Sequence, residues 1–420
     1  MSKSKGNFFM SMCIIGTLFF TIGFATWVNG TLIPYLQIAC QLETEIQAYL
    51  VATAFYIAYT LMALPSSYVL GKVGYKKGMS LSLFVMAIGA IIFVPAATVR
   101  SFNLFLVGLF IIGTGLALLQ TAVNPYVSII GPSESAATRM SIMGISNKIA
   151  GILAGLIFGY ITLSDVDALE ASLASMNALE KAATLDELAS RVIIPYYIIA
   201  AVLAVLAVVI WMSSLPEIQG EEDEEVPDNS GDTSRSSILQ FPHLLLGVLA
   251  LFLYVGVEVV AGDTIIGYGK SLDISLSVAR YFTQITLACM LLGYVIGIFA
   301  IPKYISQAKA LAVCAILGLI FSVGALVTTG YVSVACIALL GLANSLMWPA
   351  IFPLAIHNLG KFTARGSALL VMAISGGAIL PLIYGTLSDM YNGQLAYLVL
   401  LPCYAYICFF AVKGHKIGLK

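Results

Sequence analysis

The sequence predicts an all-α membrane protein with twelve transmembrane helices in two similar six-helix halves. Three observations support this fold class: the composition, the number of apolar segments and a repeated motif. Of the 420 residues, 60% are hydrophobic and only 10% are charged, whereas soluble proteins carry about 25% charged residues. Because so few polar side chains cannot cover a soluble surface of this size, the lipid bilayer is the expected solvent. The net charge of −1 gives no sign of nucleic-acid binding.

Twelve segments are long and apolar enough to cross a bilayer, for which a helix needs roughly 20 apolar residues. The first segment follows a short start with Lys3 and Lys5 and is longer than the core of a signal peptide, so we expect it to remain as a span. The expected spans are residues 8–36, 46–71, 78–98, 102–128, 139–164, 192–214, 243–268, 277–301, 308–328, 331–356, 366–387 and 394–412.

The 20 lysines and arginines are unevenly divided between the connecting segments. If the N-terminus is cytoplasmic, Lys148 lies within a span and all but five of the others fall on the cytoplasmic side. Cytoplasmic loops carry the excess of Lys and Arg in membrane proteins. We therefore expect a multi-pass protein of a bacterial inner membrane with both termini in the cytoplasm. The five external residues are Arg100, Lys181, Arg191, Lys270 and Arg280.

Two long connections interrupt the series of spans. Residues 215–242 contain an acidic run at 221–225 and are expected to form a flexible cytoplasmic linker between two halves, 1–214 and 243–420. Residues 165–191 form an external insertion. A short surface helix is expected in this insertion from the helical spacing of Leu169, Leu173, Met176 and Leu179.

A repeat relates the two halves. The motif Tyr-x-Thr-Leu-Ser-Asp occurs at 160–165 and again at 384–389. At the same offset Pro125 matches Pro349, and Gln120 matches Asn344. Because both copies begin on the same side of the membrane, the halves have the same orientation. Parallel repeats of this kind place a substrate site near the bilayer midplane, between the halves.

Three charged residues fall clearly within apolar spans: Lys148, Glu258 and Asp263. Charged groups inside a membrane are costly and frequently mark substrate or ion pathways. One interpretation is a titratable or cation-binding centre at Glu258 and Asp263 with Lys148 as a nearby charge. The alternative is a fixed salt bridge that locks two helices together.

Aromatic and amide side chains also lie deep in the spans. Trp27 and Trp348 can stack on the apolar face of a sugar ring while amides bind its hydroxyl groups. Each amide alone is slightly more typical of a hydrogen bond between helices than of a ligand contact. Together with the two tryptophans they indicate a neutral, hydroxyl-rich substrate. The amides are Asn29, Gln120, Asn124, Asn147 and Asn344.

No pattern in the sequence suggests an enzyme. The seven cysteines form no CxxC pair and no metal-ligand spacing, and no catalytic His, Cys or Ser constellation occurs. We expect a monomer with no metal and no cofactor, apart from Na⁺ or H⁺ as a coupling ion.

Four segments resemble the fucose/glucose/galactose sugar symporters of the major facilitator superfamily. They are Gly23–Pro34, Ala54–Tyr59, Leu118–Tyr126 and Asn344–Pro349. The resemblance implies a major facilitator fold that imports a monosaccharide with a cation by alternating access. It places the sugar between the halves and implicates Trp27, Asn29, Gln120, Asn124, Asn147 and Trp348.

Two departures from the family concern the coupling residues. Many members have an aspartate where this chain has Gly30, and the proton-driven fucose members have a glutamate where it has Gln120. Coupling would then shift to Glu258 and Asp263, or be absent, as in a facilitator. Drug efflux on the same fold is a further alternative. The segment around Glu258 resembles the branch associated with glucose, galactose or N-acetylglucosamine more than fucose itself.

A basic loop between the second and third expected spans resembles the conserved cytoplasmic loop of major facilitators. In the family this loop closes the cytoplasmic face through charge pairs. The alternative is ordinary positive charge on the cytoplasmic side. The residues of this expected cytoplasmic gate are Gly71, Lys72, Gly74, Lys76 and Lys77.

Overall fold

The computed structural model describes residues 2–129, 136–173, 175–213, 215, 237–301, 303–359 and 362–419. Throughout these residues the chain is helical and contains no strand. Twelve helical stretches are long and apolar enough to cross a membrane, which confirms the expected number of spans. The acidic run at 221–225 lies outside the described residues.

The first six spans are formed by nine helices. These are α1 (Ser2–Trp27), α2 (Asn29–Ala39), α3 (Glu45–Val73), α4 (Tyr75–Thr98), α5 (Phe102–Ile129), α6 (Ala136–Leu163), α7 (Val166–Leu173), α8 (Ala178–Ser190) and α9 (Ile193–Met212).

The other six spans begin after a short 3-10 turn, Ile238–Gln240. They comprise α10 (Pro242–Asp263), α11 (Ile265–Ser271), α12 (Leu276–Ala279), α13 (Phe282–Ala300), α14 (Gln307–Val327), α15 (Gly330–Asn344), α16 (Met347–Ile356), α17 (Thr363–Met372), α18 (Gly376–Met390), α19 (Gly393–Ala396) and α20 (Leu400–Val412). Further 3-10 turns lie at Ala373–Ser375, Tyr397–Val399 and Gly414–Lys416.

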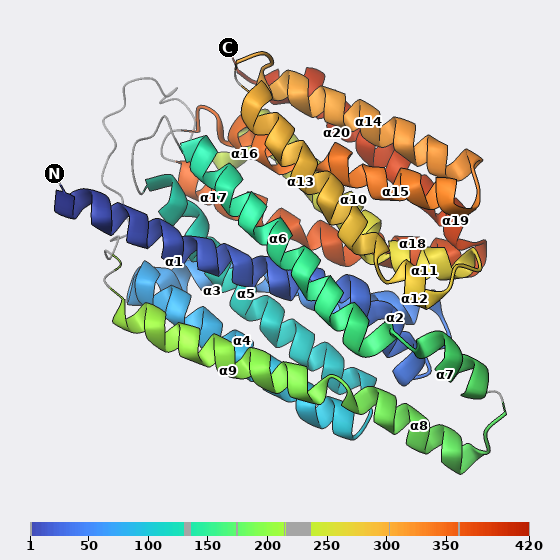
Figure 1. Cartoon of the computed structure of the whole chain (residues 1–420). Coiled ribbons are helices and arrows are strands. Elements are labelled where there is room, and N and C mark those ends of the chain that lie inside the picture. The colour runs from blue at the N-terminus through green and yellow to red at the C-terminus, as the bar shows by residue number, and fades with distance from the viewer. Residues whose placement is uncertain are drawn as a thin grey trace.

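The helices form two bundles that lie side by side. In Figure 1 the blue-to-green helices α1–α9 make one bundle and the yellow-to-red helices α10–α20 make the other. Both chain termini lie at one end of the molecule, and α7, α8 and α12 lie at the opposite end. We call this opposite end the distal end; it comprises residues 40–46, 164–173, 175–192, 270–281, 327–331 and 389–393.

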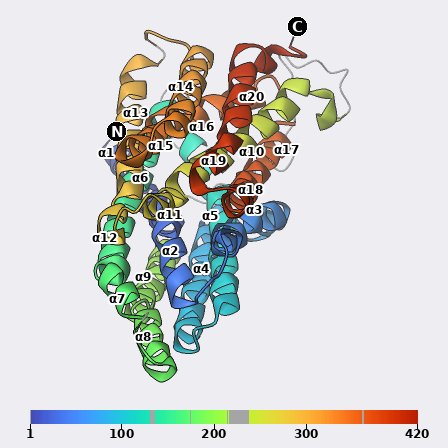
Figure 2. The same ribbon diagram turned by 90° about the vertical axis from the view of Figure 1, so that its right-hand side faces the viewer.

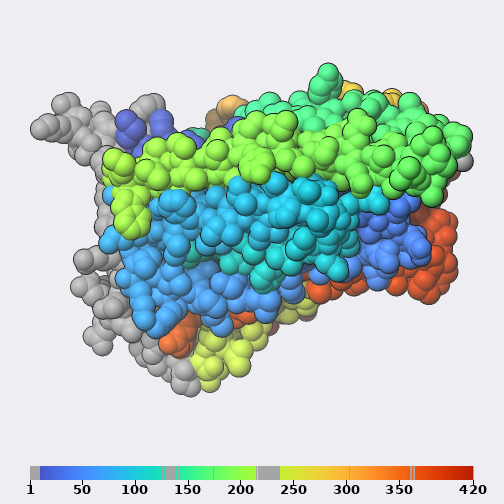
Figure 3. Space-filling view, turned by 90° about the horizontal axis from the view of Figure 1, so that it is seen from below, coloured from blue at the N-terminus to red at the C-terminus, as the bar shows by residue number. Residues whose placement is uncertain are grey.

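The long faces of the bundles are apolar. Figure 3 shows one such face, on which α9 runs beside α4. Along α9 the side chains of Ile194, Ile198, Val202 and Val205 are all more than half exposed. A soluble protein rarely leaves so large an apolar patch uncovered, so this surface fits contact with lipid.

Six spans that were expected to be continuous are interrupted. The eighth, eleventh and twelfth pass through a short turn or 3-10 segment at residues 280–281, 373–375 and 397–399. The first span breaks at Val28, the seventh at Thr264 and the tenth between Asn344 and Met347. At the seventh break, the Thr264 hydroxyl donates at 2.6 Å to the Val260 carbonyl, which also accepts the Thr264 main-chain N–H at 3.2 Å. The first and seventh spans occupy corresponding places in the two halves, and paired breaks of this kind point to a binding site.

The external insertion contains two helices rather than the single short helix expected. The chain leaves α7 at Leu173 and starts α8 at Ala178, because Asn177 makes a capping box with Glu180. Leu179 is 82% exposed, so its helical spacing does not reflect packing.

Candidate functional site

An ion pair joins the two halves in the middle of the membrane-spanning region. Lys148 on α6 donates to a carboxylate oxygen of Glu258 on α10 at 2.9 Å. Their side chains are only 8% and 11% exposed. The structure therefore brings together two of the three charged residues that the sequence placed inside spans. In a medium of low polarity such a pair is strongly held, and removing one partner leaves an uncompensated charge.

Trp27 extends this charged cluster instead of offering an open stacking surface. The Lys148 ammonium lies 4.2 Å from the centre of its ring, within the range of a cation–π interaction. The indole N–H donates to the Asn147 side chain at 3.3 Å. Cβ atoms added at Gly151 or Gly262 would lie 2.6 Å from ring atoms. With 3% of its surface exposed, Trp27 has no free face for a sugar in this conformation.

The other predicted contacts divide into satisfied and accessible groups. Asn344 is buried and accepts a hydrogen bond from Tyr404 at 2.8 Å within its own half, as a residue that joins helices would do. Gln120 donates to the Tyr59 hydroxyl at 2.7 Å but remains half-buried, as does Asn124 one turn further along α5.

Trp348 on α16 is the more accessible of the two deep tryptophans. It is half-buried and lies nearly parallel to Phe352, with 5.8 Å between ring centres. Of the two candidate stacking residues, Trp348 retains surface for a ligand and Trp27 does not.

The breaks in the first and seventh spans meet each other. A Cβ added at Gly30 would lie 3.0 Å from the Thr283 hydroxyl and 3.1 Å from the Gly262 carbonyl oxygen. A carboxylate at position 30 therefore has no room here. The neighbours of this contact, Asn29 and Asp263, are 0% and 1% exposed. Within the described chain, neither amide atom of Asn29 and neither carboxylate oxygen of Asp263 has a hydrogen-bond partner.

The distal ends of the two halves are held together by a reciprocal pair of carboxylates. Asp389, at the end of α18, accepts hydrogen bonds from the main-chain N–H groups of Glu45 and Ile46 at 2.8 and 3.0 Å. These groups begin α3 and have no partner within their helix. A carboxylate is favoured there by both hydrogen bonding and the helix dipole.

Asp167 makes the matching contact in the opposite direction. Its carboxylate accepts from the main-chain N–H groups of Leu276 and Ser277 at 2.8 and 2.9 Å, where α12 begins the eighth span. Lys270 and Glu170 add an ion pair of 2.7 Å nearby. Figure 2 looks onto this end and shows α12 beside α7 and α18 beside α3. The conformation is closed at the distal end.

The basic loop makes no charge pair with any other residue that the structure describes. Gly74 has a φ of 82°, which favours glycine at the turn from α3 to α4. Lys76 donates to the Ser213 carbonyl at 2.7 Å within the same half, and Lys72 lies over the Tyr68 ring. Lys77 is exposed. No carboxylate in the described ranges pairs with Lys72, Lys76 or Lys77, and Gly71 has no neighbour within 4 Å of an added Cβ.

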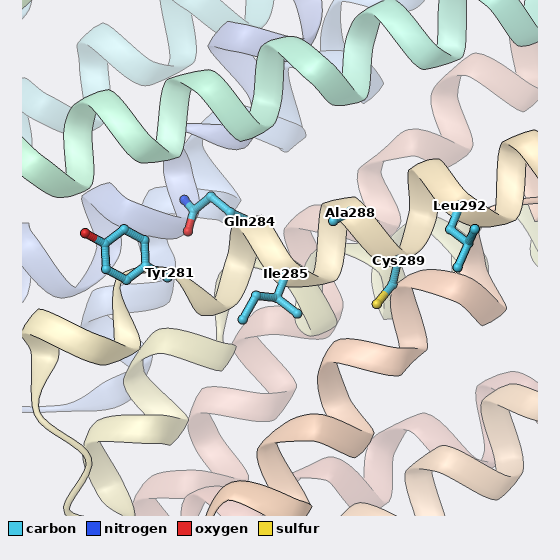
Figure 4. A pocket seen from close by; sticks show the side chains of 6 residues that line it. All are labelled: Tyr281, Gln284, Ile285, Ala288, Cys289 and Leu292. Atoms are coloured by element: carbon cyan, nitrogen blue, oxygen red, sulfur yellow. The ribbon is translucent and has the colours of Figure 1, made fainter.

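Two hollows lie outside this centre. Figure 4 shows one of about 450 Å³ along α13, lined by Tyr281, Gln284, Ile285, Ala288, Cys289 and Leu292. Its lining is almost wholly apolar, so it does not fit a hydroxyl-rich sugar. A second, of about 320 Å³, lies at the distal end between Gln37, Gln41, Lys181, Glu170 and Lys270.

Sequence reasoning assigned no role to several residues that the structure brings into the contact between halves. Asp389 lies in the repeated motif, so the repeat was a usable signal for it. Asp167 is two residues past the first copy of that motif. Thr283 donates to the Gly262 carbonyl at 2.7 Å, and nothing in the sequence marks it.

Comparison with known proteins agrees with this architecture. The family model described as Major Facilitator Superfamily matches residues 15–382. The glucose/galactose transporter of Brucella abortus (strain 2308) is 35% identical over 418 residues, which cover 99% of this chain and 96% of that protein. The L-fucose-proton symporter of Escherichia coli (strain K12) is 32% identical over 416 residues, which cover 96% and 93%.

A solved structure gives the same result. The crystal structure of FucP, a major facilitator transporter in the outward conformation, matches with a TM-score of 0.75 and 31% identity over 96% of this chain and 98% of that chain. The fold, the paired halves and the named relatives all describe a transporter and not an enzyme. The chain therefore belongs to the major facilitator superfamily, as a sugar transporter of the fucose/glucose/galactose symporter family.

Proposed function

We propose that the protein imports a neutral monosaccharide together with Na⁺ or H⁺. The substrate is a glucose- or galactose-type hexose or N-acetylglucosamine, with fucose less favoured. The names of the relatives support this class of substrate. The single observation that carries the proposal is the buried Lys148–Glu258 pair, because it links the two halves beside Trp27 and Asn147.

The positive-inside distribution supports an orientation with both termini in the cytoplasm of a bacterial inner membrane. The distal end is then external, and the structure is the state closed to the outside. The two moving units would be residues 1–214 and 243–420, joined by the linker 215–242. Alternating access would proceed by rocking of these units around a midplane site.

In this proposal Glu258 exchanges partners during transport. While Glu258 is ionised and paired with Lys148, the halves are tied together at their centre. Protonation of Glu258, or a cation bound to it, would break this ion pair between the halves. Binding of the coupling ion is thereby linked to the relative position of the halves. The sugar would bind between Trp348 on one half and Gln120 and Asn124 on the other.

Uptake by proteoliposomes tests the coupling role. Glu258→Gln should keep sugar exchange at equal concentrations but lose accumulation against a gradient, because the amide cannot change charge. Lys148→Met separates coupling from packing, since it removes only the other charge. Unchanged accumulation in Glu258→Gln would leave the pair as a fixed salt bridge, the alternative considered above.

Trp348→Ala tests the sugar site. We expect at least a ten-fold loss of sugar affinity, because aromatic stacking and burial of the sugar's apolar face are both removed. Trp211→Ala is the matched control, since Trp211 is 56% exposed on α9. Wild-type affinity in Trp348→Ala would show that this tryptophan only packs.

An uncoupled sugar facilitator is the second candidate. It is favoured by Gly30 and Gln120, which replace carboxylates present in coupled relatives, and by the neutralisation of Glu258 by Lys148. Wild-type protein that equilibrates a radiolabelled sugar but never accumulates it, with or without Na⁺ and at any proton gradient, would establish this candidate. An exporter of drugs fits less well, because the accessible centre is rich in amides.

A further inference from the structure

Asp263 poses a problem that the Lys148–Glu258 pair does not solve. It is 1% exposed, and neither carboxylate oxygen has a partner in the described structure. Lys148 is already engaged by Glu258, which lies one and a half turns away on α10. An isolated buried carboxylate is far too costly to persist as a bare charge. It must therefore take up a cation or a proton.

The nearby hydroxyl groups do not supply a partner. The Thr264 hydroxyl donates to the Val260 carbonyl and also contacts the Tyr397 hydroxyl. The Thr283 hydroxyl donates to the Gly262 carbonyl. Both hydroxyl groups are thus engaged at the break in the seventh span, and neither donates to Asp263.

The break in the first span supplies polar groups in the same state. Asn29 is 0% exposed, and its amide oxygen and nitrogen have no hydrogen-bond partners among the described residues. The Thr31 hydroxyl, also at 0% exposure, is unpartnered too. Gly30, between these two residues, approaches the Gly262 carbonyl oxygen. Asn29 and Asp263 thus flank the point at which the two broken spans meet.

We propose that these two breaks form a Na⁺ site, with the Asp263 carboxylate and the Asn29 amide oxygen as its side-chain ligands. Main-chain carbonyls at the end of α10 would complete it. Carboxylate, amide and carbonyl oxygens are hard ligands, and interrupted transmembrane helices coordinate Na⁺ through such groups. This inference rests on the proposed function, since it names the coupling ion and the residues that bind it.

The chemistry favours Na⁺ over the alternatives. A proton on Asp263 would provide a single O–H donor and so could satisfy only one further oxygen, whereas Na⁺ would bind the Asp263 carboxylate, the Asn29 amide oxygen and main-chain carbonyl oxygens together. A single carboxylate matches one positive charge. In the described part of the chain no group of three or more His, Cys, Asp or Glu side chains could hold a multivalent metal.

The position of the site explains how Na⁺ binding would drive transport. Asn29 belongs to the first half and Asp263 to the second, so a bound ion bridges the two halves directly. Na⁺ would therefore stabilise conformations in which the broken spans meet, as they do here. The site is distinct from the Lys148–Glu258 pair, and the two act in series along α10.

Binding of ²²Na⁺ to the purified full-length protein in lipid nanodiscs tests the site directly, without sugar. We expect saturable binding by the wild type, at least ten-fold weaker binding by Asp263→Asn, and weaker binding by Asn29→Ala. Asp273→Asn is the matched control, because Asp273 lies exposed in the turn after α11.

Thermal unfolding shows whether each variant is folded. Na⁺ should raise the unfolding temperature of the wild type and not that of Asp263→Asn, which in Na⁺-free buffer should be at least as stable as the wild type because a buried charge is gone. Na⁺ binding that survives in Asp263→Asn would overturn the proposal. So would sugar accumulation that needs Asp263 but follows only the proton gradient.

The failure of this site and of the proposed function can be told apart. Na⁺ binding that depends on Asp263, in a protein that transports none of the tested sugars, would retain the site and reject the sugar proposal. Sugar accumulation without any Na⁺ binding would do the reverse.

Discussion

The two lines of contact between the halves, α3 with α18 and α6 with α13, are related by the repeat but are built differently. The α3–α18 line is closely packed: Tyr49 meets Tyr384 edge to face at 5.5 Å, and Thr53 donates to the Ala378 carbonyl at 2.8 Å. The α6–α13 line is more polar. Arg280 donates to the Gly159 carbonyl at 3.3 Å.

The repeated aspartate shows how the two lines diverged. Asp389 crosses to the other half and caps α3. Its counterpart Asp165 stays within its own half and pairs with Arg191, and the crossing is made by Asp167 instead. On both lines, therefore, a carboxylate binds the start of a helix in the opposite half. The residue that provides this carboxylate differs between the two lines. The α3–α18 line adds the ring packing of Tyr49 and Tyr384, and the α6–α13 line adds the Arg280 hydrogen bond and the Lys270–Glu170 ion pair.

The largest expected effect comes from disturbing the packed line. A Cβ at Gly385 would lie 2.7 Å from a ring atom of Tyr49 and would also be in tight contact with main-chain atoms of Ile46. Gly385→Ala should therefore push α3 and α18 apart. Overpacking of this kind costs about 1–3 kcal/mol, which corresponds to roughly a five- to hundred-fold shift toward a distal-open state.

Spin labels on exposed distal residues of the two halves measure this shift. Suitable positions are Leu179 and Tyr331, at 82% and 63% exposure, in a background whose native cysteines are replaced. Gly71→Ala is the control, because nothing lies within 4 Å of its added Cβ. Equal distance distributions for both alanine variants would show that the α3–α18 line is not held by shape.

The second effect compares the two copies of the repeated aspartate. Asp389→Asn should weaken the contact with α3 by about 1 kcal/mol, because the amide keeps only one acceptor oxygen for the two N–H groups and carries no charge. The population should then shift toward the distal-open state about five-fold. Asp165→Asn should leave this population unchanged, since its partner Arg191 belongs to the same half. Equal effects from the two variants would contradict the difference drawn between them.

The sequence predicted the large features of this fold because they depend on composition and periodicity. The length of the apolar segments predicted the number of spans, and the repeat predicted that the two halves are parallel. Those signals do not report how a helix is interrupted. The breaks at Val28 and Thr264 depend on contacts with the opposite half, such as the approach of Gly30 to the Gly262 carbonyl. No local pattern encodes a partner that lies more than 200 residues away.

The sequence predicted which residues belong to the candidate site better than it predicted how they are arranged. Lys148, Glu258 and Asp263 stood out because charge is rare in spans, but the sequence did not show that only Glu258 would be paired. Trp27 and Trp348 looked alike as deep aromatics. Packing separates them, since Gly151 and Gly262 admit the ring of Trp27 into a closed slot. Burial of this kind is a property of three converging helices.

The third effect removes one hydrogen bond from the packed line without changing its shape. Thr53→Val deletes the donor to the Ala378 carbonyl and keeps a similar volume. The net loss for a hydrogen bond of this type is about 0.5–1.5 kcal/mol. The distances between the distal spin labels should shift less than in Gly385→Ala. Thr53→Ser keeps the hydroxyl, so its distances should match those of the wild type. An effect of Thr53→Ser as large as that of Thr53→Val would point to lost packing instead of the hydrogen bond.

The smallest effect concerns the ion pair at the rim of the polar line. Lys270 and Glu170 are 41% and 32% exposed, and ion pairs in such surroundings contribute about 0–1 kcal/mol. Glu170→Gln should therefore shift the population toward the distal-open state by less than about five-fold at 0.15 M salt. The shift should be smaller still at 1 M, where the screening length falls to about 3 Å. Asp167→Asn, whose carboxylate holds two main-chain N–H groups across the same line, should exceed it at both salt concentrations. The reverse order would mean that the α6–α13 line is held by surface charge and that the carboxylate cap is incidental there.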